Sequence, residues 1–141
     1  MAGYIRKLRG ATTLSAHVAQ QYSTLTRALE LHRGGLSHSR LKRVVEYIHS
    51  NLGDDLHLQS LAEVAGLNLH HFAKAFKQSV GESPHQFVLR QRVERAKEFL
   101  GKSRLSVLEA SARTGFVDQS HFSKVFRRFV GVAPSDYRSN S

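Results

Sequence analysis

The chain contains HFAKAFKQSVGESPHQF from His71 to Phe87 and, fifty residues later, HFSKVFRRFVGVAPSDY from His121 to Tyr137. Paired positions in the two stretches carry the same or similar residues. The matched pairs are His71 with His121, Phe72 with Phe122, Lys74 with Lys124, Phe76 with Phe126, Lys77 with Arg127, Val80 with Val130, Gly81 with Gly131, and Pro84 with Pro134. Two copies of a short basic unit are suited to contacting two neighbouring parts of one partner.

Composition narrows the fold and the partner. The chain has 141 residues, 40% of them hydrophobic, two prolines and a formal net charge of +10. This length suits one domain or two small subdomains, and long stretches with a 3.6-residue apolar period predict an all-α fold. A folded surface this basic attracts polyanions, so nucleic acid is the leading partner. The sequence has no cysteine, which agrees with a reducing compartment, and no apolar run of the roughly 18 residues that a membrane span needs.

Apolar periodicity, glycines and N-cap residues predict the positions of the helices. The expected helices are a first one from about 39 to 52, short helices at 58–65 and 106–115, longer ones at 69–80 and 118–130, a central helix at 84–100, and a last short helix from Pro134. A short helix, a glycine turn and a second helix occur twice, at about 58–80 and 106–130. Each is a helix-turn-helix candidate. The second turn holds one more residue than the first. Leu58 of the first short helix is expected to point inward, Leu89, Val93, Ala96 and Leu100 are the apolar stripe of the central helix, and Tyr137 of the last helix is expected to lie against the core.

The helical repeat assigns an inner and an outer face to each second helix. The residues expected inside are Leu69, Phe72, Phe76, Ser79 and Val80 in the first copy, and Phe122, Phe126, Phe129 and Val130 in the second. The residues expected outside are His70, His71, Lys74, Lys77 and Gln78 in the first copy, and Ser120, His121, Lys124, Arg127 and Arg128 in the second. A single basic helix face usually has no role beyond contact with solvent. Here two such faces occur, each on a helix that follows a glycine turn, in a strongly basic chain. This favours DNA reading, because lysine pairs with the guanine O6/N7 acceptors.

Other functions fit the sequence less well. The phenylalanines lie at core spacing, which argues against platforms for stacking single-stranded bases. His70 and His71 diverge on a helix, and no HExxH motif or Cys/His cluster appears, so no metal or other cofactor is expected. Nothing resembles a nucleophile with its base or a phosphate loop, so no catalytic residue is predicted. A non-specific architectural binder and an RNA-binding module remain as alternatives.

Residues 1–35 are the least informative part of the sequence. Their basic, acid-poor start formally resembles a transit peptide, whereas the apolar stripe from Leu14 to Leu29 fits a helical linker better. Gly34 and Gly35 mark a junction. We expect this segment to be a linker or the remnant of an effector domain.

Two stretches, LAEVAGLNLHHFAKAFKQSVGESPHQF and GFVDQSHFSKVFRRFVGVAPSDYR, resemble the two helix-turn-helix units of the AraC/XylS family of bacterial transcription regulators. The resemblance covers about Leu36 to Arg138. It implies a DNA-binding domain at 36–139, built of seven helices in a homeodomain-like arrangement with two subdomains joined by the central helix. Departures are Ala110 and Ser111, where a larger aliphatic residue and an alanine are usual, and His57 in place of a serine or threonine cap. Each is expected to cost something like a kcal/mol.

The resemblance also implies the roles of individual residues. The positions carried over as base contacts are His70, Lys74, Ser120, His121 and Lys124. Positions expected to contact or flank the DNA backbone are His71, Lys77, Gln78, Gln119, Ser123, Arg127 and Arg128. Ala73 stands at a family contact position and offers only an apolar contact.

The expected partner is double-stranded promoter DNA, read as a non-palindromic site by two recognition helices in adjacent major grooves. The resemblance further implies RNA polymerase as a partner and a bacterial, cytoplasmic, nucleoid-associated protein. No membrane association and no small-molecule ligand are expected for this chain. An activator is expected, although the sequence does not distinguish activation from repression, and the target sequence, the effector and the oligomeric state are left open.

Overall fold

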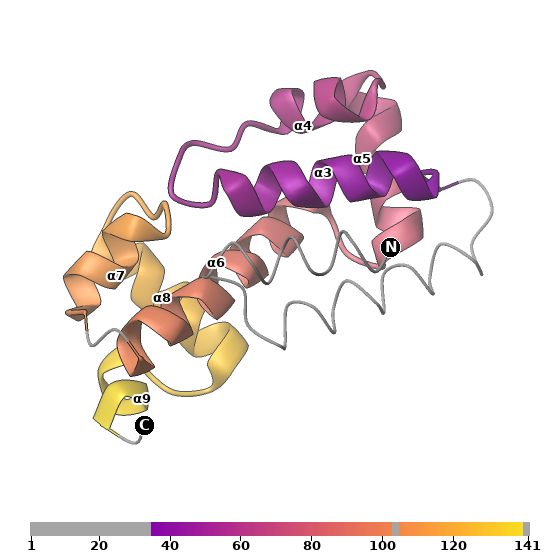
Figure 1. The fold of residues 1–141 in the computed structure, drawn as a ribbon. Helices are drawn as coiled ribbons and strands as arrows, with labels where there is room; N and C mark the ends of the chain where they lie inside the picture. The colour runs from indigo at the N-terminus through magenta and orange to yellow at the C-terminus, as the bar shows by residue number, and fades with distance from the viewer. Residues whose placement is uncertain (1–34, 103–104, 140–141) are drawn as a thin grey trace. The chain divides into compact units, whose positions relative to one another are not determined.

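The computed structural model describes residues 35–102 and 105–139. Throughout these residues the regular structure is helical, with seven helices and no strand (Figure 1), which confirms the all-α prediction. The helices are α3 (His38–Ser50), α4 (Leu58–Ala65), α5 (Leu69–Val80), α6 (Pro84–Gly101), α7 (Val107–Arg113), α8 (Gln119–Val130) and α9 (Pro134–Ser139). The predictions made for residues 1–34 lie outside the described residues.

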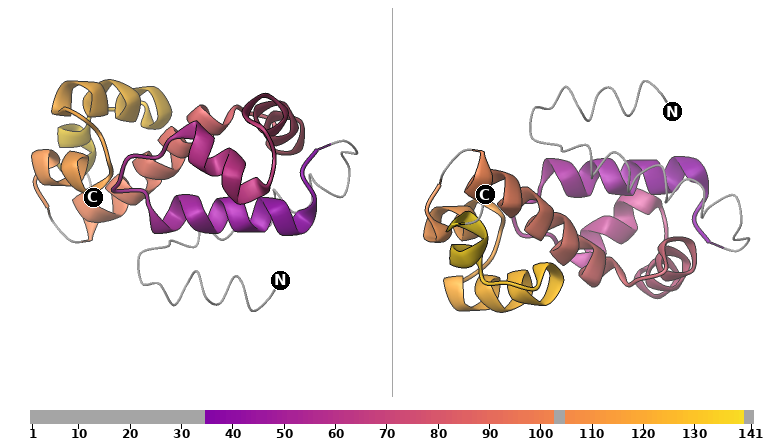
Figure 2. Two further views of the ribbon diagram at one scale, coloured as in Figure 1. Left: turned by 90° about the horizontal axis from the view of Figure 1, so that it is seen from above. Right: turned by 90° about the horizontal axis from the view of Figure 1, so that it is seen from below.

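The described part divides into two compact units, and the first contains α3, α4, α5 and the start of α6. Helix α3 packs against α4, and α4 packs against α5 (Figure 2). The buried residues of this unit include Leu41, Val44, Val45, Ile48, Leu61, Ala62, Ala65, Phe72, Ala75, Phe76 and Phe87. Burial of these side chains supplies the main stabilisation of the unit, at about 25 cal/mol per Å² of apolar surface removed from water.

The start of the described chain is anchored in the first unit. Leu36 is buried, and its backbone N–H donates a hydrogen bond of 2.7 Å to the Ser79 hydroxyl oxygen, which is also buried. Gly35 approaches the same side chain so closely that a Cβ at position 35 would lie 2.0 Å from the Ser79 Oγ atom. The chain is therefore held against the last turn of α5.

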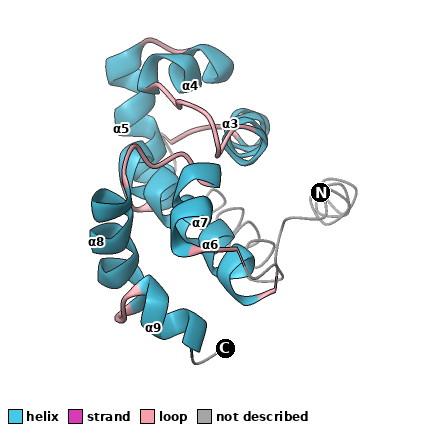
Figure 3. Cartoon of the chain, turned by 90° about the vertical axis from the view of Figure 1, so that its left-hand side faces the viewer, coloured by secondary structure: helices cyan, strands magenta, loops and turns pink. Residues whose placement is uncertain are grey.

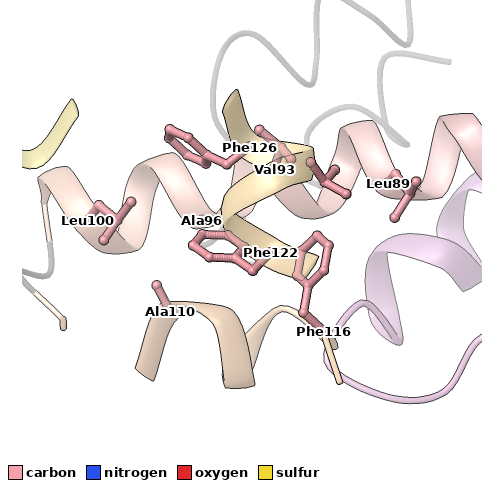
Figure 4. Close-up of a cluster of buried hydrophobic side chains, with 9 residues drawn as sticks. Leu89, Val93, Ala96, Leu100, Ala110, Phe116, Phe122 and Phe126 are labelled. Carbon is pink, nitrogen blue, oxygen red and sulfur yellow. The ribbon is translucent and has the colours of Figure 1, made fainter. Parts of the chain in front are cut away.

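The second unit contains Leu52–Asp55, the rest of α6, and helices α7, α8 and α9. Helix α8 packs against both α7 and α9 (Figure 3). The core of the second unit brings together side chains from α6, α7, α8 and the turn before α8 (Figure 4). The cluster consists of Leu89, Val93, Ala96, Leu100, Ala110, Phe116, Phe122, Val125 and Phe126. The predicted inner stripe of the central helix, Leu89, Val93, Ala96 and Leu100, is thus confirmed as core.

Helix α6 begins in the first unit and continues through the second as one element. Its start follows the prediction, because the Ser83 hydroxyl accepts a hydrogen bond of 3.2 Å from the Gln86 N–H and Pro84 occupies the first helical position. Phe87 in its first turn packs edge-on against Phe76, with ring centroids 5.4 Å apart.

Some predicted boundaries and inner positions were wrong. Helix α3 ends at Ser50, before the predicted end near residue 52, and Gly101 still belongs to α6. Leu58 and Leu69, predicted to point inward, are 37% and 41% exposed. Both are the first residue of their helix, where fewer residues of the same helix surround the side chain. The angular position of a residue around the helix axis, from which these faces were predicted, does not show that a residue at the helix end is exposed.

Candidate nucleic-acid interface

Each helix-turn-helix contains a glycine in the left-handed backbone region, where residues with a side chain are strained. Gly66 follows α4 with a φ of 74°, and Gly115 follows α7 with a φ of 83°. Their surroundings differ. A Cβ at Gly66 would meet nothing within 4 Å, whereas a Cβ at Gly115 would lie 2.4 Å from the carbonyl oxygen of Leu52. The second turn is therefore packed against another part of the chain.

Helices α5 and α8 begin in the same way. The Asn68 side-chain oxygen accepts a 2.8 Å hydrogen bond from the His71 N–H, and an Asp118 carboxylate oxygen accepts one of 2.7 Å from the His121 N–H. These N-caps confirm the predicted starts of both helices. The second cap differs in carrying a negative charge.

The phenylalanines of the two helices point into the cores. Phe72 and Phe76 on α5 have ring centroids 5.7 Å apart, and Phe122 and Phe126 on α8 repeat this contact at 5.6 Å. All four side chains are fully buried. They hold each helix by one face and are not available as base-stacking platforms. Tyr137 of α9 packs against Phe126 at 5.6 Å, as predicted for the last helix.

The opposite faces of α5 and α8 carry the predicted site residues. Of the twelve predicted positions, Ser123 is partly buried and the others are exposed. On α5 the exposed positions are His70, His71, Lys74, Lys77 and Gln78. On α8 they are Gln119, Ser120, His121, Lys124, Arg127 and Arg128. Neither helix contains an acidic residue, so both exposed faces combine hydrogen-bond donors with positive charge.

The turn before α8 also orients one of the site residues. The His121 ring packs edge-on against Phe116, with centroids 5.5 Å apart, and Phe116 itself is buried beside Phe122. The next residue, Val117, is 91% exposed. Val117 was not predicted as a site residue. The extra residue in the second turn was the only sign in the sequence that this turn differs from the first.

A partly buried arginine packs against the second turn. Arg92 of α6 donates from Nε to the Leu52 carbonyl oxygen at 3.2 Å and from Nη2 to the Asp54 carbonyl oxygen at 2.8 Å. A Cβ at Gly115 would lie 2.9 Å from the same guanidinium carbon. Burial lowers the pKa of Arg92, and the nearby charge of Asp55 opposes that shift. The segment 52–55 is thereby fixed between α6 and the second turn.

A residue of α6 contacts α8 through the Phe129 ring. The guanidinium carbons of Arg90 and Arg128 each lie 4.9 Å from the centroid of the Phe129 ring. Phe129, predicted to be inside, is partly buried and packs against the core of the second unit. Arg90 was not predicted as a site residue, because only its tertiary contact with Phe129 of α8 shows its position.

The described residues contain no candidate membrane span and no candidate metal site. No helix there is long and apolar enough to cross a membrane. No group of three or more His, Cys, Asp or Glu side chains in residues 35–102 and 105–139 is placed to hold a metal ion.

Comparison with known sequences supports the interpretation of these helices. A family described as "Helix-turn-helix domain" matches residues 61–140. The regulatory protein PocR of Salmonella typhimurium is 37% identical over 107 residues, which cover 75% of this chain and 35% of PocR. The chain thus spans about a third of the length of the curated relatives it matches.

Solved structures resemble the fold over most of the chain. The C-terminal domain of AraT, a response regulator from Geobacillus stearothermophilus, aligns with a TM-score of 0.70 at 31% identity, covering 75% of this chain and 88% of that domain. The DNA-binding domain of AdpA, solved in complex with a target DNA, aligns with a TM-score of 0.66 at 31% identity, covering 69% of this chain and 87% of that one. With the family match over more than half of its residues, the chain belongs to the AraC/XylS-type helix-turn-helix family of DNA-binding transcriptional regulators, which is not an enzyme family.

Proposed function

We propose that this chain reads a non-palindromic promoter site by inserting α5 and α8 into adjacent major grooves of double-stranded DNA. The observation that carries this proposal is the repeated design of the two helices. Each is capped at its start, held by a pair of buried phenylalanines, and exposes a face with donors and no acid. Successive major grooves on one side of B-form DNA are about 34 Å apart, which gives a site of roughly 20 base pairs.

Five exposed residues are proposed to contact bases. They are His70 and Lys74 on α5, with Ser120, His121 and Lys124 on α8. Lysine donates to the O6 and N7 acceptors of guanine. Serine and histidine have shorter side chains and are proposed to hydrogen-bond to base edges closer to the helix. Because the two sets differ, the half-sites are expected to differ in sequence. The two units follow each other in one chain, so the site is expected to be a loose direct repeat.

The remaining site residues are proposed to position the protein on the backbone. They are His71, Lys77 and Gln78 on α5, with Gln119, Ser123, Arg127 and Arg128 on α8. Phosphate contacts of this kind fix register and add affinity without sequence information. The partly buried Ser123 has the least access of the seven.

The proposed DNA-binding domain runs from 36 to 139, and residues 1–35 are proposed to be a linker or a remnant of an effector domain. AdpA, whose DNA-binding domain was solved with a target DNA, supports duplex DNA as the partner. RNA polymerase is the second partner we propose, because the relatives that resemble this chain are named as transcription regulators.

Selection of bound sequences from a random pool of DNA duplexes tests the proposal. The expected result is a two-part consensus with unequal half-sites in direct orientation. Absence of enrichment, with equal affinity for selected and random duplexes, would instead indicate an architectural binder. Competition by double-stranded RNA as strong as that by the selected DNA would indicate an RNA-binding module.

A further inference from the structure

We infer that Arg90, on helix α6, binds a phosphate of the DNA backbone together with Arg128 of α8, and that the Phe129 ring, which both arginines contact, positions both guanidinium groups. This inference rests on the proposed function and adds a residue from outside the recognition helices to the binding surface. The ligand is the phosphodiester group of a DNA duplex.

The geometry around Phe129 supports the pairing. Each guanidinium carbon lies 4.9 Å from the ring centroid, so the two carbons are separated by at most twice that distance. Cation–π attraction holds an arginine over a ring face and restricts the conformations of its long side chain. The ring itself is partly buried and packs against the core of the second unit, so it is a fixed support.

Charge supplies the second argument. Both guanidinium groups are positively charged, and their carbons are separated by no more than about a Debye length at physiological ionic strength, so a phosphate placed beside both groups is attracted by both charges. The planar, forked guanidinium group suits this role, because it donates two parallel hydrogen bonds to phosphate oxygens.

The position on α8 connects this pair to the proposed DNA-facing side. Arg128 is exposed and follows Lys124 by one helical turn, and Lys124 follows Ser120 by another. Arg90 lies next to the end of this stripe through its contact with Phe129. A helix lying in the major groove has the DNA backbone at the groove edges, where residues beyond its base-reading part meet phosphates.

The first copy differs at both α8 positions. Gln78 stands where the second copy has Arg128, and Ser79 stands where it has Phe129. Ser79 is buried and accepts the hydrogen bond of Leu36. The first copy therefore lacks an aromatic ring at this place, and the arginine pair is a property of the second unit alone among the two copies.

Salt-dependent binding of the full chain to a random-sequence duplex tests the inference. The logarithm of affinity falls with the logarithm of salt concentration, and each phosphate contact adds about 0.9 to the slope. We expect Arg90→Gln to lower the slope by about one and to weaken binding about tenfold at physiological salt. The control Arg43→Gln removes an exposed arginine from α3, outside both helix-turn-helix units, and is expected to leave the slope unchanged.

Two further variants separate the shared phosphate from simple loss of charge. If Arg90 and Arg128 bind one phosphate, the double variant Arg90→Gln with Arg128→Gln weakens binding by less than the product of the two single effects. Phe129→Leu keeps an apolar side chain on the core but removes the ring, and is expected to weaken binding with all charges retained. Ethylation interference on the selected duplex shows which phosphates weaken binding when they are ethylated. In Arg90→Gln, ethylation of one phosphate is expected to have no further effect, while the other phosphates keep theirs. Unfolding of the variant would not produce this local change.

An unchanged salt slope and an unchanged ethylation pattern in Arg90→Gln would overturn the inference. Full multiplicativity of the two arginine variants would overturn the shared phosphate. The proposed function fails differently, through equal affinity of the wild-type chain for selected and random duplexes. A phosphate contact by Arg90 is still measured in that case, because it does not depend on sequence.

Discussion

Asn68 and Asp118 cap α5 and α8 with the same geometry but different charge. An amide oxygen and a carboxylate oxygen are about equally good caps, and a carboxylate also interacts favourably with the positive end of the helix dipole. The carboxylate, however, stands at the end of α8 that is proposed to meet DNA, where phosphates repel it. The two copies thus balance helix stability and DNA affinity differently at one position.

Removal of the cap tests its contribution. Asp118→Ala is expected to lower the free energy of unfolding by about 1 kcal/mol, because the His121 N–H loses its acceptor. Asp118→Asn keeps an acceptor and is the matched control, expected within about 0.5 kcal/mol of the wild type. Urea unfolding followed by circular dichroism measures both. Equal midpoints for Asp118→Ala and the wild type would contradict the role of the cap.

Lys74 and Lys124 occupy matched exposed positions on α5 and α8. Lys74→Ala and Lys124→Ala are each expected to lose about 1 to 3 kcal/mol of binding to the selected site, with discrimination relaxed at a different base pair for each variant. Gel-shift titrations on the selected duplex and on single-base variants measure this. If the losses are the same on random DNA, both lysines contact only phosphates.

At the level of elements, the two turns look alike in sequence and differ in packing. Gly66 and Gly115 both have a positive φ, but only Gly115 lies against other backbone, the carbonyl of Leu52. The support comes from Arg92, which donates to the carbonyls of Leu52 and Asp54. The turn before α8 is therefore supported by a segment far from it in sequence.

Alanine at each glycine measures that difference. Gly66→Ala is expected to cost about 1 to 2 kcal/mol, which is the ordinary penalty of a side chain in the left-handed region. Gly115→Ala is expected to cost more, because its Cβ would lie 2.4 Å from a backbone oxygen that side-chain rotation cannot move. Denaturant titrations of the two variants provide the comparison. Similar losses of unfolding free energy in the two variants would show that segment 52–55 moves easily to accommodate the added Cβ.

The sequence predicted those elements whose ends are marked by local chemistry. Helices α4 and α5 begin and end where predicted, because Gly66, Asn68 and Gly81 act on their immediate neighbours. The inner positions of the phenylalanines also followed from helical spacing. Leu69 was assigned wrongly and Arg90 was missed, because their surroundings depend on which helices pack nearby and how far those helices extend.

For the whole molecule, two unlike recognition helices in one chain give the proposed DNA site a direction. Lys74 and Lys124 are identical residues at matching positions. In contrast, Ser120 stands at the position of His70, and Arg128 stands at the position of Gln78. Each helix is therefore expected to prefer its own half-site. A two-fold symmetric dimer, in contrast, reads a palindrome.

Exchange of the two half-sites tests this directionality. With spacing and base composition kept, the exchanged duplex is expected to bind no better than random DNA, since each mismatched base pair costs about 1 to 3 kcal/mol and several mismatches accumulate. The original duplex with altered flanking sequence is the control and is expected to bind normally. Gel-shift competition measures both. Equal competition by the exchanged duplex would show that the two helices read alike.

The anchoring of Leu36 on Ser79 has a mechanical consequence. The hydrogen bond of 2.7 Å is buried and joins the start of the described chain to the last turn of α5. Tension applied to the chain upstream of Gly35 is therefore transmitted directly to α5 through this hydrogen bond. A pull on this point would load one of the two proposed DNA-reading helices directly.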